Sequence, residues 1–182
     1  IQNGTIIDGW GEGRFQSDIG IKNNRIQAMG DLSMAKSGRK INAANRIVAP
    51  GFIDVYTHDD RVLLAKPTMD MKISQGVTSV IVGNCGISLA PLVADNPPPP
   101  LDLIAEPGAC RYSTFDQFLQ EVEGAPAAVN AAFLVGHSTL RVGTMDSLDR
   151  AASLTEIKKM RSLLEEGLTA GAIGFSTGLF YK

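Results

Sequence analysis

The sequence has 182 residues with a net charge of −2, and 44% of its residues are hydrophobic and 20% charged. This composition is typical of a globular chain with a hydrophobic core, and its charge balance gives no basis for binding nucleic acid or an anionic membrane. The sequence shows neither a transmembrane segment nor a signal-peptide pattern, and two cysteines exclude a disulfide framework. We therefore expect a cytoplasmic location.

The first 48 residues contain short apolar runs separated by turns. Apolar and polar residues alternate over 17–22, and a second short run follows over 25–29. Alternation of this kind is typical of strands with one buried face. The dipeptide Asn23-Asn24 separates these two runs and is typical of a tight hairpin turn. The sequence therefore predicts a small β-sandwich-like module over residues 1–48.

From residue 49 onward, apolar strands alternate with helical segments. The expected strands are 51–56, 78–83, 131–136 and 172–176. A helix is expected over 62–75, although Pro67 limits it because proline lacks the backbone N–H. A second helix is expected after Ser153-Leu-Thr-Glu156, which has the pattern of a capping box. Strands that alternate with helices predict a parallel α/β sheet.

Polar side chains follow the first of these strands. The apolar run within residues 47–60, Ile-Val-Ala-Pro-Gly-Phe-Ile-Asp-Val-Tyr-Thr-His-Asp-Asp, ends in Tyr56, His58 and the pair Asp59-Asp60. A histidine at the carboxyl end of a barrel strand is well placed to bind a metal. The two aspartates are candidates either to orient His58 or to cap the following helix.

Cys85 follows the second strand, within Val80-Ile-Val-Gly-Asn-Cys-Gly-Ile-Ser-Leu-Ala-Pro91. It would face the same rim as His58, and both its sulfur and an imidazole nitrogen suit zinc. A buried structural cysteine is the alternative, because free cysteine is among the most buried residue types. The spacing alone leaves the role of Cys85 open.

Four motifs, in the same order along the chain, resemble those of the D-aminoacylase family of the amidohydrolase superfamily. They are segments 50–60 and 82–91, Gly136-His-Ser-Thr-Leu-Arg141 and Gly171-Ala-Ile-Gly-Phe-Ser-Thr-Gly-Leu-Phe-Tyr181. The resemblance implies a zinc enzyme in which a zinc-activated water hydrolyses the amide bond of an N-acyl-D-amino acid, a carbon–nitrogen bond other than a peptide bond. It also implies that Cys85 and His58 bind the metal and that the general base lies beyond Lys182.

The resemblance further implies an α/β fold in which residues 49–182 form the first half of a (β/α)8 barrel. Four strands cannot close an eight-stranded barrel, and they leave an edge strand and an apolar face uncovered. We therefore expect this chain to be the N-terminal portion of a longer enzyme. Its partners would be the remainder of its own barrel and the small-molecule substrate, and the chain alone would be inactive.

Tyr56 departs from the family signature, Pro-Gly-Phe-Ile-Asp-x-His-x-His, because it stands in place of the first histidine. A neutral phenol, with an ordinary pKa of about 10, is a poor metal ligand. We therefore expect one zinc, and a non-catalytic barrel homologue is the alternative. A hydantoinase-like cyclic amidase is the other alternative, but such relatives bridge two metals with a carboxylated fourth-strand lysine, and this chain has no lysine there before Lys182.

Three further residues follow the third and fourth strands. They are His137, Ser176 and Tyr181. Because the carboxyl ends of barrel strands meet at one rim, we expect these residues, with Tyr56, to line the substrate pocket or to orient the ligands. Backbone hydrogen bonding and loop capping are the alternative roles.

Overall fold

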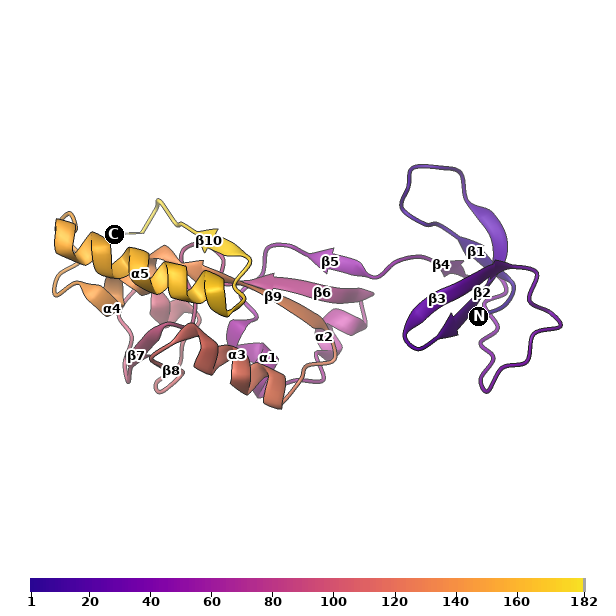
Figure 1. The fold of residues 1–182 in the computed structure, drawn as a ribbon, viewed down its shortest axis with the longest axis horizontal. Coiled ribbons are helices and arrows are strands. Elements are labelled where there is room, and N and C mark those ends of the chain that lie inside the picture. The colour runs from indigo at the N-terminus through magenta and orange to yellow at the C-terminus, as the bar shows by residue number, and fades with distance from the viewer. Residues whose placement is uncertain (182) are drawn as a thin grey trace. The chain divides into compact units, whose positions relative to one another are not determined.

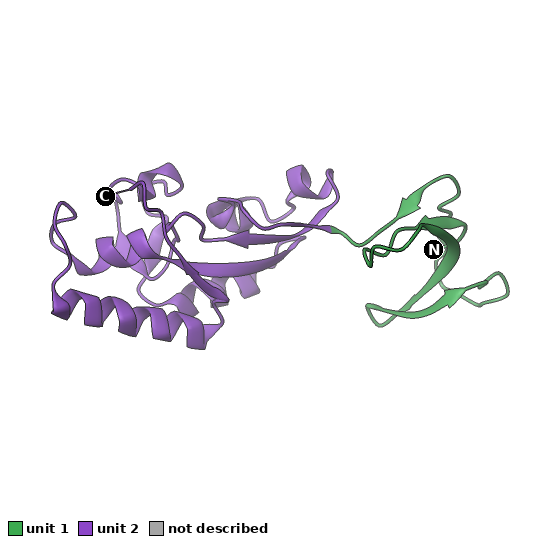
Figure 2. Cartoon of the chain, turned by 90° about the horizontal axis from the view of Figure 1, so that it is seen from above, with its two compact units in different colours: residues 1–51 green, residues 52–182 purple. Residues whose placement is uncertain are grey.

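The computed structural model describes residues 1–181, and the chain divides into two compact units, Ile1–Gly51 and Phe52–Lys182 (Figure 2). The first unit contains strands only, whereas the second unit contains both strands and helices (Figure 1).

The first unit contains a four-stranded sheet in the order β3-β2-β1-β4. Its strands are β1 (Gly4–Ile6), β2 (Phe15–Lys22), β3 (Arg25–Gly30) and β4 (Ile47–Val48). Strands β2 and β3 form an antiparallel hairpin, and its turn residues Asn23 and Asn24 have φ values of 52° and 58°. Positive φ at both central residues is what the favoured two-residue hairpin turn requires. The hairpin predicted from the alternating pattern is therefore confirmed.

The second unit is built on a parallel sheet in the order β10-β9-β6-β5. Its strands are β5 (Phe52–Asp54), β6 (Val77–Val82), β9 (Asn130–Gly136) and β10 (Gly174–Ser176). Each predicted strand is present with its ends shifted by at most about two residues. The order of these four strands across the sheet is the same as their order along the chain, and helices connect each strand to the next. This order is that of a barrel wall, because a doubly wound sheet reverses its strand order.

The helices that connect these strands agree only partly with the sequence. They are α1 (Asp60–Ala65), α2 (Asp70–Ile73), α3 (Phe115–Gly124), α4 (His137–Thr144) and α5 (Leu154–Ala170). The helix expected over 62–75 is split into α1 and α2, because the backbone leaves the helical path around Pro67 and Met69 has a φ of 47°. Helix α5 begins at the predicted capping box of Ser153 and Glu156. None of the helices in the described part of the chain combines the length and apolar character needed to cross a membrane.

The connection between β6 and β9 contains a small hairpin that the sequence did not reveal. Strands β7 (Leu92–Ala94) and β8 (Cys110–Tyr112) pair antiparallel, and the short 3-10 helix η1 (Leu101–Leu103) lies between them. The proline run 96–100 is a loop, as expected, since it cannot donate to a ladder.

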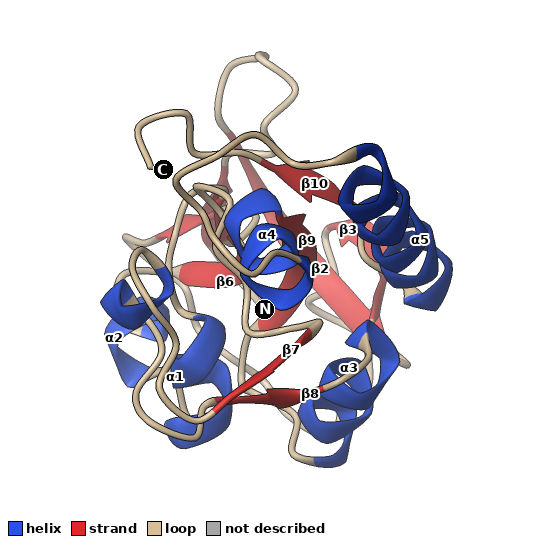
Figure 3. Cartoon of the chain, turned by 90° about the vertical axis from the view of Figure 1, so that its left-hand side faces the viewer, coloured by secondary structure: helices blue, strands red, loops and turns tan. Residues whose placement is uncertain are grey.

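The core of the second unit lies between the sheet and the helices; in Figure 3, α1, α2, α3 and α5 lie at the sides and below, and α4 lies in front of the strands. Its buried members include Val80, Val82 and Val135 from the strands and Phe115, Phe118, Leu140 and Met160 from the helices. The two outer strands, unlike the central ones, carry exposed apolar side chains. Phe52 and Ile53 on β5 are 66% and 62% exposed, and Phe175 on β10 is 42% exposed. Apolar side chains therefore remain uncovered at both edges of the sheet.

Candidate functional site

The carboxyl ends of β5 and β6 bring three of the predicted residues together. Tyr56 and His58 follow β5, and Cys85 follows β6. The phenol oxygen of Tyr56 lies 2.5 Å from Sγ of Cys85, and the rings of Tyr56 and His58 meet edge to face with centroids 6.0 Å apart. The hydrogen bond to Cys85 raises the pKa of the Tyr56 phenol above its ordinary value, so the phenol is neutral at neutral pH.

Cys85 lies in a turn whose backbone is tightly constrained. Its own φ is 56°, and Gly83 and Gly86 have φ values of 82° and 77°. Side-chain-bearing residues rarely adopt this left-handed region, whereas glycine enters it freely. A Cβ at Gly83 would lie 2.2 Å from the carbonyl oxygen of Leu134 in β9, so only glycine fits there. The turn holds the cysteine in a conformation that a free loop would avoid.

Ser176, at the end of β10, binds the backbone on both sides of Cys85. Its hydroxyl accepts a hydrogen bond from the N–H of Gly86 at 2.9 Å and donates to the carbonyl of Gly83. The carbonyl of Gly86 in turn accepts the N–H of Ser138 in the first turn of α4 at 2.8 Å. Ser176 therefore holds the backbone on either side of Cys85 in place.

Buried polar atoms without partners lie beside this turn. Nδ1 of His58 is buried and has no hydrogen-bond partner among residues 1–181. Buried polar atoms in native proteins are nearly always hydrogen-bonded, so this nitrogen is suited to a ligand.

Asp59 occupies the N-cap position of α1 without a side-chain cap, and its carboxylate pairs with Lys72 at 2.9 Å. Of the two roles left open for Asp59, the N-cap position is thus confirmed, but its carboxylate pairs with Lys72 and makes no capping hydrogen bond.

Asp60 is the most deeply buried carboxyl group near the site. It is 1% exposed, and its Oδ2 has no hydrogen-bond partner within the described residues. Burial raises its pKa from an ordinary 3.8 to about 7, and the charge of Asp59 acts in the same direction. The sequence identified Asp60 only as one of two acidic neighbours of His58.

His137 and Tyr181 line one pocket of about 500 Å³, which also includes Arg141. His137 is the first residue of α4, whereas the sequence placed it at the end of a strand. Its ring lies 5.8 Å from that of Phe175, and burial together with the charge of Arg141 lowers its pKa. His137 is therefore a neutral imidazole at neutral pH.

The donor set fits zinc in kind but is incomplete. His58 offers an imidazole nitrogen without a partner, and Cys85 offers a sulfur. No cluster of three or more histidine, cysteine, aspartate or glutamate side chains suited to a metal occurs within residues 1–181. Because protein zinc sites use three or four protein ligands, a zinc site that includes His58 and Cys85 would need further ligands.

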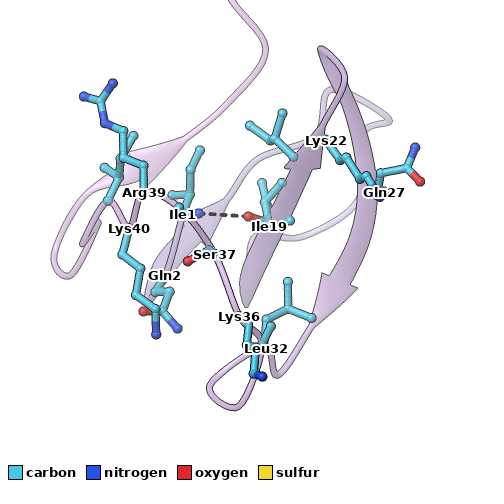
Figure 4. A pocket seen from close by; sticks show the side chains of 15 residues that line it. Ile1, Gln2, Ile19, Lys22, Gln27, Leu32, Lys36, Ser37, Arg39 and Lys40 are labelled. Carbon is cyan, nitrogen blue, oxygen red and sulfur yellow. Dashed lines mark hydrogen bonds between the residues drawn. The ribbon is translucent and has the colours of Figure 1, made fainter.

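A cavity of about 620 Å³ in the first unit contains none of these residues (Figure 4). It is lined by basic side chains such as Lys22, Lys36 and Arg39, and the amino group of Ile1 donates to the carbonyl of Ile19 at 2.8 Å across it. Its lining contains no aspartate, glutamate, histidine or cysteine. The chemistry of this chain therefore gathers at the strand ends of the second unit.

Comparison with known families agrees with this arrangement, since the model described as "Amidohydrolase family" matches residues 39–182. The chain belongs to the amidohydrolase family. It is 52% identical to the D-aminoacylase and 50% identical to the N-acyl-D-aspartate deacylase of Alcaligenes xylosoxydans xylosoxydans. Each match covers 100% of this chain but only 37% and 36% of the relative, so the chain spans little more than a third of their length.

Solved amidohydrolase structures show the same fold. A D-aminoacylase described as having a binuclear metal centre, with one-metal activation and second-metal attenuation, superposes with a TM-score of 0.97 at 50% identity. The N-acyl-D-glutamate deacylase of Bordetella bronchiseptica, solved with zinc and a phosphonate mimic of the tetrahedral intermediate, gives 0.93 at 38% identity. Both matches cover 100% of this chain and 38% of the other. The predicted α/β fold, part of an amidohydrolase barrel, is therefore confirmed.

Two residues at the site escaped the sequence analysis. Lys72 is one of many lysines, and nothing in its surroundings along the chain marks it. Gly83 belongs to the motif around Cys85, within residues 80–91. Its spacing from Gly86 around the cysteine was a signal, because paired glycines often mark a turn that no side chain can enter.

Proposed function

We propose that this chain is the N-terminal part of a zinc-dependent amidohydrolase that removes the acyl group from N-acyl-D-amino acids. The observation that carries the proposal is the constrained turn that holds Cys85 against Tyr56 at the carboxyl ends of β5 and β6. Active sites of barrel enzymes lie at this end of the strands. The similarity of this whole chain to about a third of two deacylases of N-acyl-D-amino acids supports the substrate class.

In this proposal Cys85 and His58 bind zinc, which supplies a Lewis acid for the amide carbonyl. The buried Nδ1 of His58, which has no partner among the described residues, supports its role, and the constrained backbone of Cys85 supports a fixed position for its sulfur. The remaining ligands and the general base come from chain outside residues 1–181.

Tyr56 supports a site with one tightly bound zinc. Its hydroxyl contacts the sulfur of Cys85, and its raised pKa keeps it a neutral phenol. A neutral phenol binds a metal less readily than imidazole does.

The proposed substrate pocket includes His137 and Tyr181, which already line one cavity. A neutral His137 offers one donor and one acceptor to an acyl-amino acid. Ser176 acts through the Cys85 turn and thereby orients the ligand.

The remainder of the barrel is the proposed partner of this chain. The exposed apolar side chains of β5 and β10 support this, because open strand edges and large apolar patches are normally covered. We retain the cytoplasm as the proposed location, because Cys85 and Cys110 are both free thiols.

The test uses the full-length protein with Cys85→Ala and, as a matched control, Cys110→Ala, which removes a buried cysteine from β8. We expect the natural protein and the control to bind zinc and to hydrolyse an N-acetyl-D-amino acid but not its L enantiomer. Cys85→Ala should lose both zinc and turnover while it keeps a cooperative unfolding transition. Retained zinc in Cys85→Ala would exclude the ligand assignment. Bound zinc without turnover in the natural protein would favour the non-catalytic alternative.

A further inference from the structure

Lys72 of α2 contacts three oxygen atoms of segment 54–59, which runs from the last residue of β5 to the residue before α1. Its Nζ lies 2.7 Å from Oδ2 of Asp54 and 2.9 Å from Oδ2 of Asp59. It also donates to Oγ1 of Thr57 at 3.1 Å. These three partners bracket Tyr56 and His58 in the sequence, so one ammonium group binds the segment 54–59 at both ends and in the middle.

This cluster is partly shielded from water. The side chains of Lys72 and Asp59 are 18% and 12% exposed, and that of Asp54 is 30% exposed. Ion pairs on an open surface contribute little, whereas removing one partner from a shielded pair leaves a charge without compensation. Loss of the ammonium group would therefore leave two neighbouring carboxylates to repel each other and loosen the segment.

Further hydrogen bonds connect the cluster to the candidate site. Oδ1 of Asp54 accepts the backbone N–H of Tyr56 at 3.2 Å. Nδ2 of Asn84, the residue before Cys85, donates to the carbonyl of Thr57 at 3.1 Å and to that of Ile81 at 2.8 Å. The segment is thus fixed to α2 by charge and to the end of β6 by an amide. Both attachments act on the backbone that carries Tyr56 and His58.

We propose that Lys72 is a positioning residue that holds segment 54–59 closed over the Cys85 turn. In the closed arrangement the hydroxyl of Tyr56 contacts the sulfur of Cys85, and His58, whose Nδ1 is buried without a partner among the described residues, follows two residues further on. The contact of Tyr56 with Cys85 is a property of the protein without metal, whereas the consequence for zinc rests on the proposed function.

The first experiment measures the alkylation of cysteines by iodoacetamide in zinc-free, full-length protein, with each cysteine followed by peptide mass spectrometry. Lys72→Met keeps the length of the side chain and removes its charge. We expect Cys85 to react about tenfold faster in Lys72→Met, because losing hydrogen bonds to a charged group makes local opening more frequent. Cys110, which is 2% exposed, should stay unreactive and so report that the fold is intact.

Two further variants make the result specific. Lys72→Arg restores a cation that can bridge two carboxylates, so it should return the Cys85 rate towards that of the natural protein. Lys158→Met removes an exposed lysine from α5 and should leave the rate unchanged. Equal Cys85 rates in the natural protein and Lys72→Met would overturn the proposal. So would parallel acceleration at Cys110, since it would show general destabilisation.

The second experiment measures zinc affinity by competition with a chromophoric chelator. We expect Lys72→Met to bind zinc about tenfold more weakly than the natural protein, since metal affinity falls by one to two orders of magnitude when groups that orient ligands are removed. Unchanged affinity in Lys72→Met would overturn the role of Lys72 towards the metal. Absence of zinc binding in the natural protein would contradict the proposed function instead, and the alkylation result would still decide whether Lys72 closes the segment.

Discussion

Replacing Gly83 with alanine adds only one methyl group, but it should destabilise the Cys85 turn strongly. Glycine at this position has a φ of 82°, and an added Cβ would lie 2.2 Å from the carbonyl oxygen and 2.9 Å from the carbonyl carbon of Leu134. The left-handed backbone alone costs alanine about 1 kcal/mol. The contacted atoms are backbone atoms of the central strand β9 and cannot rotate away, so β6 and β9 must separate. We expect a total loss of about 4 kcal/mol in the free energy of unfolding.

Gly108 provides the matched control for this substitution. Its φ is 77°, but an added Cβ there meets nothing within 4 Å. Gly108→Ala should therefore cost only the backbone term of about 1 kcal/mol. Thermal or urea unfolding of the two full-length variants measures the difference, and zinc analysis reports whether Cys85 has moved. Losses for the two variants that agree within about 1 kcal/mol would refute the steric reasoning.

Two further predictions concern neighbouring residues. Because the pKa of Asp60 is about 7 in the folded protein and 3.8 ordinarily, the folded state binds the extra proton between these values. The free energy of unfolding of the zinc-free protein should then fall by at most about 4 kcal/mol as pH rises from 4 to 7. Asp60→Asn should abolish this fall, and melting temperatures measured over the same pH range report it. Identical pH dependence in both proteins would contradict the prediction. Tyr56→His should raise bound zinc from one to two per chain in metal analysis, because His58 already lies two residues further on; two zinc ions in the natural protein would exclude the one-zinc expectation.

The sequence alone determined the elements whose signals are local. Alternating residues on either side of Asn23-Asn24 specified a hairpin, because that turn needs only two residues with positive φ. Ser153 and Glu156 specified the start of α5 by hydrogen-bonding each other's backbone. Two apolar runs specified strands, and the sequence placed His58 and Cys85 after them. Because parallel strands bring their carboxyl ends to one edge, the sequence also placed these two residues at the same edge of the sheet.

Only the tertiary structure decided how these residues meet. The contact of Tyr56 with Cys85 joins residues from successive βα units, and the ion pairs of Lys72 join α2 to residues 13 and 18 positions earlier in its own unit, so no local pattern encodes them. The burial of Asp60, and with it the raised pKa, depends on the surrounding packing, because desolvation is a property of the surroundings and not of the residue. Periodicity records which side of an element faces the core, whereas distances and charges across the site arise only when separate elements pack together.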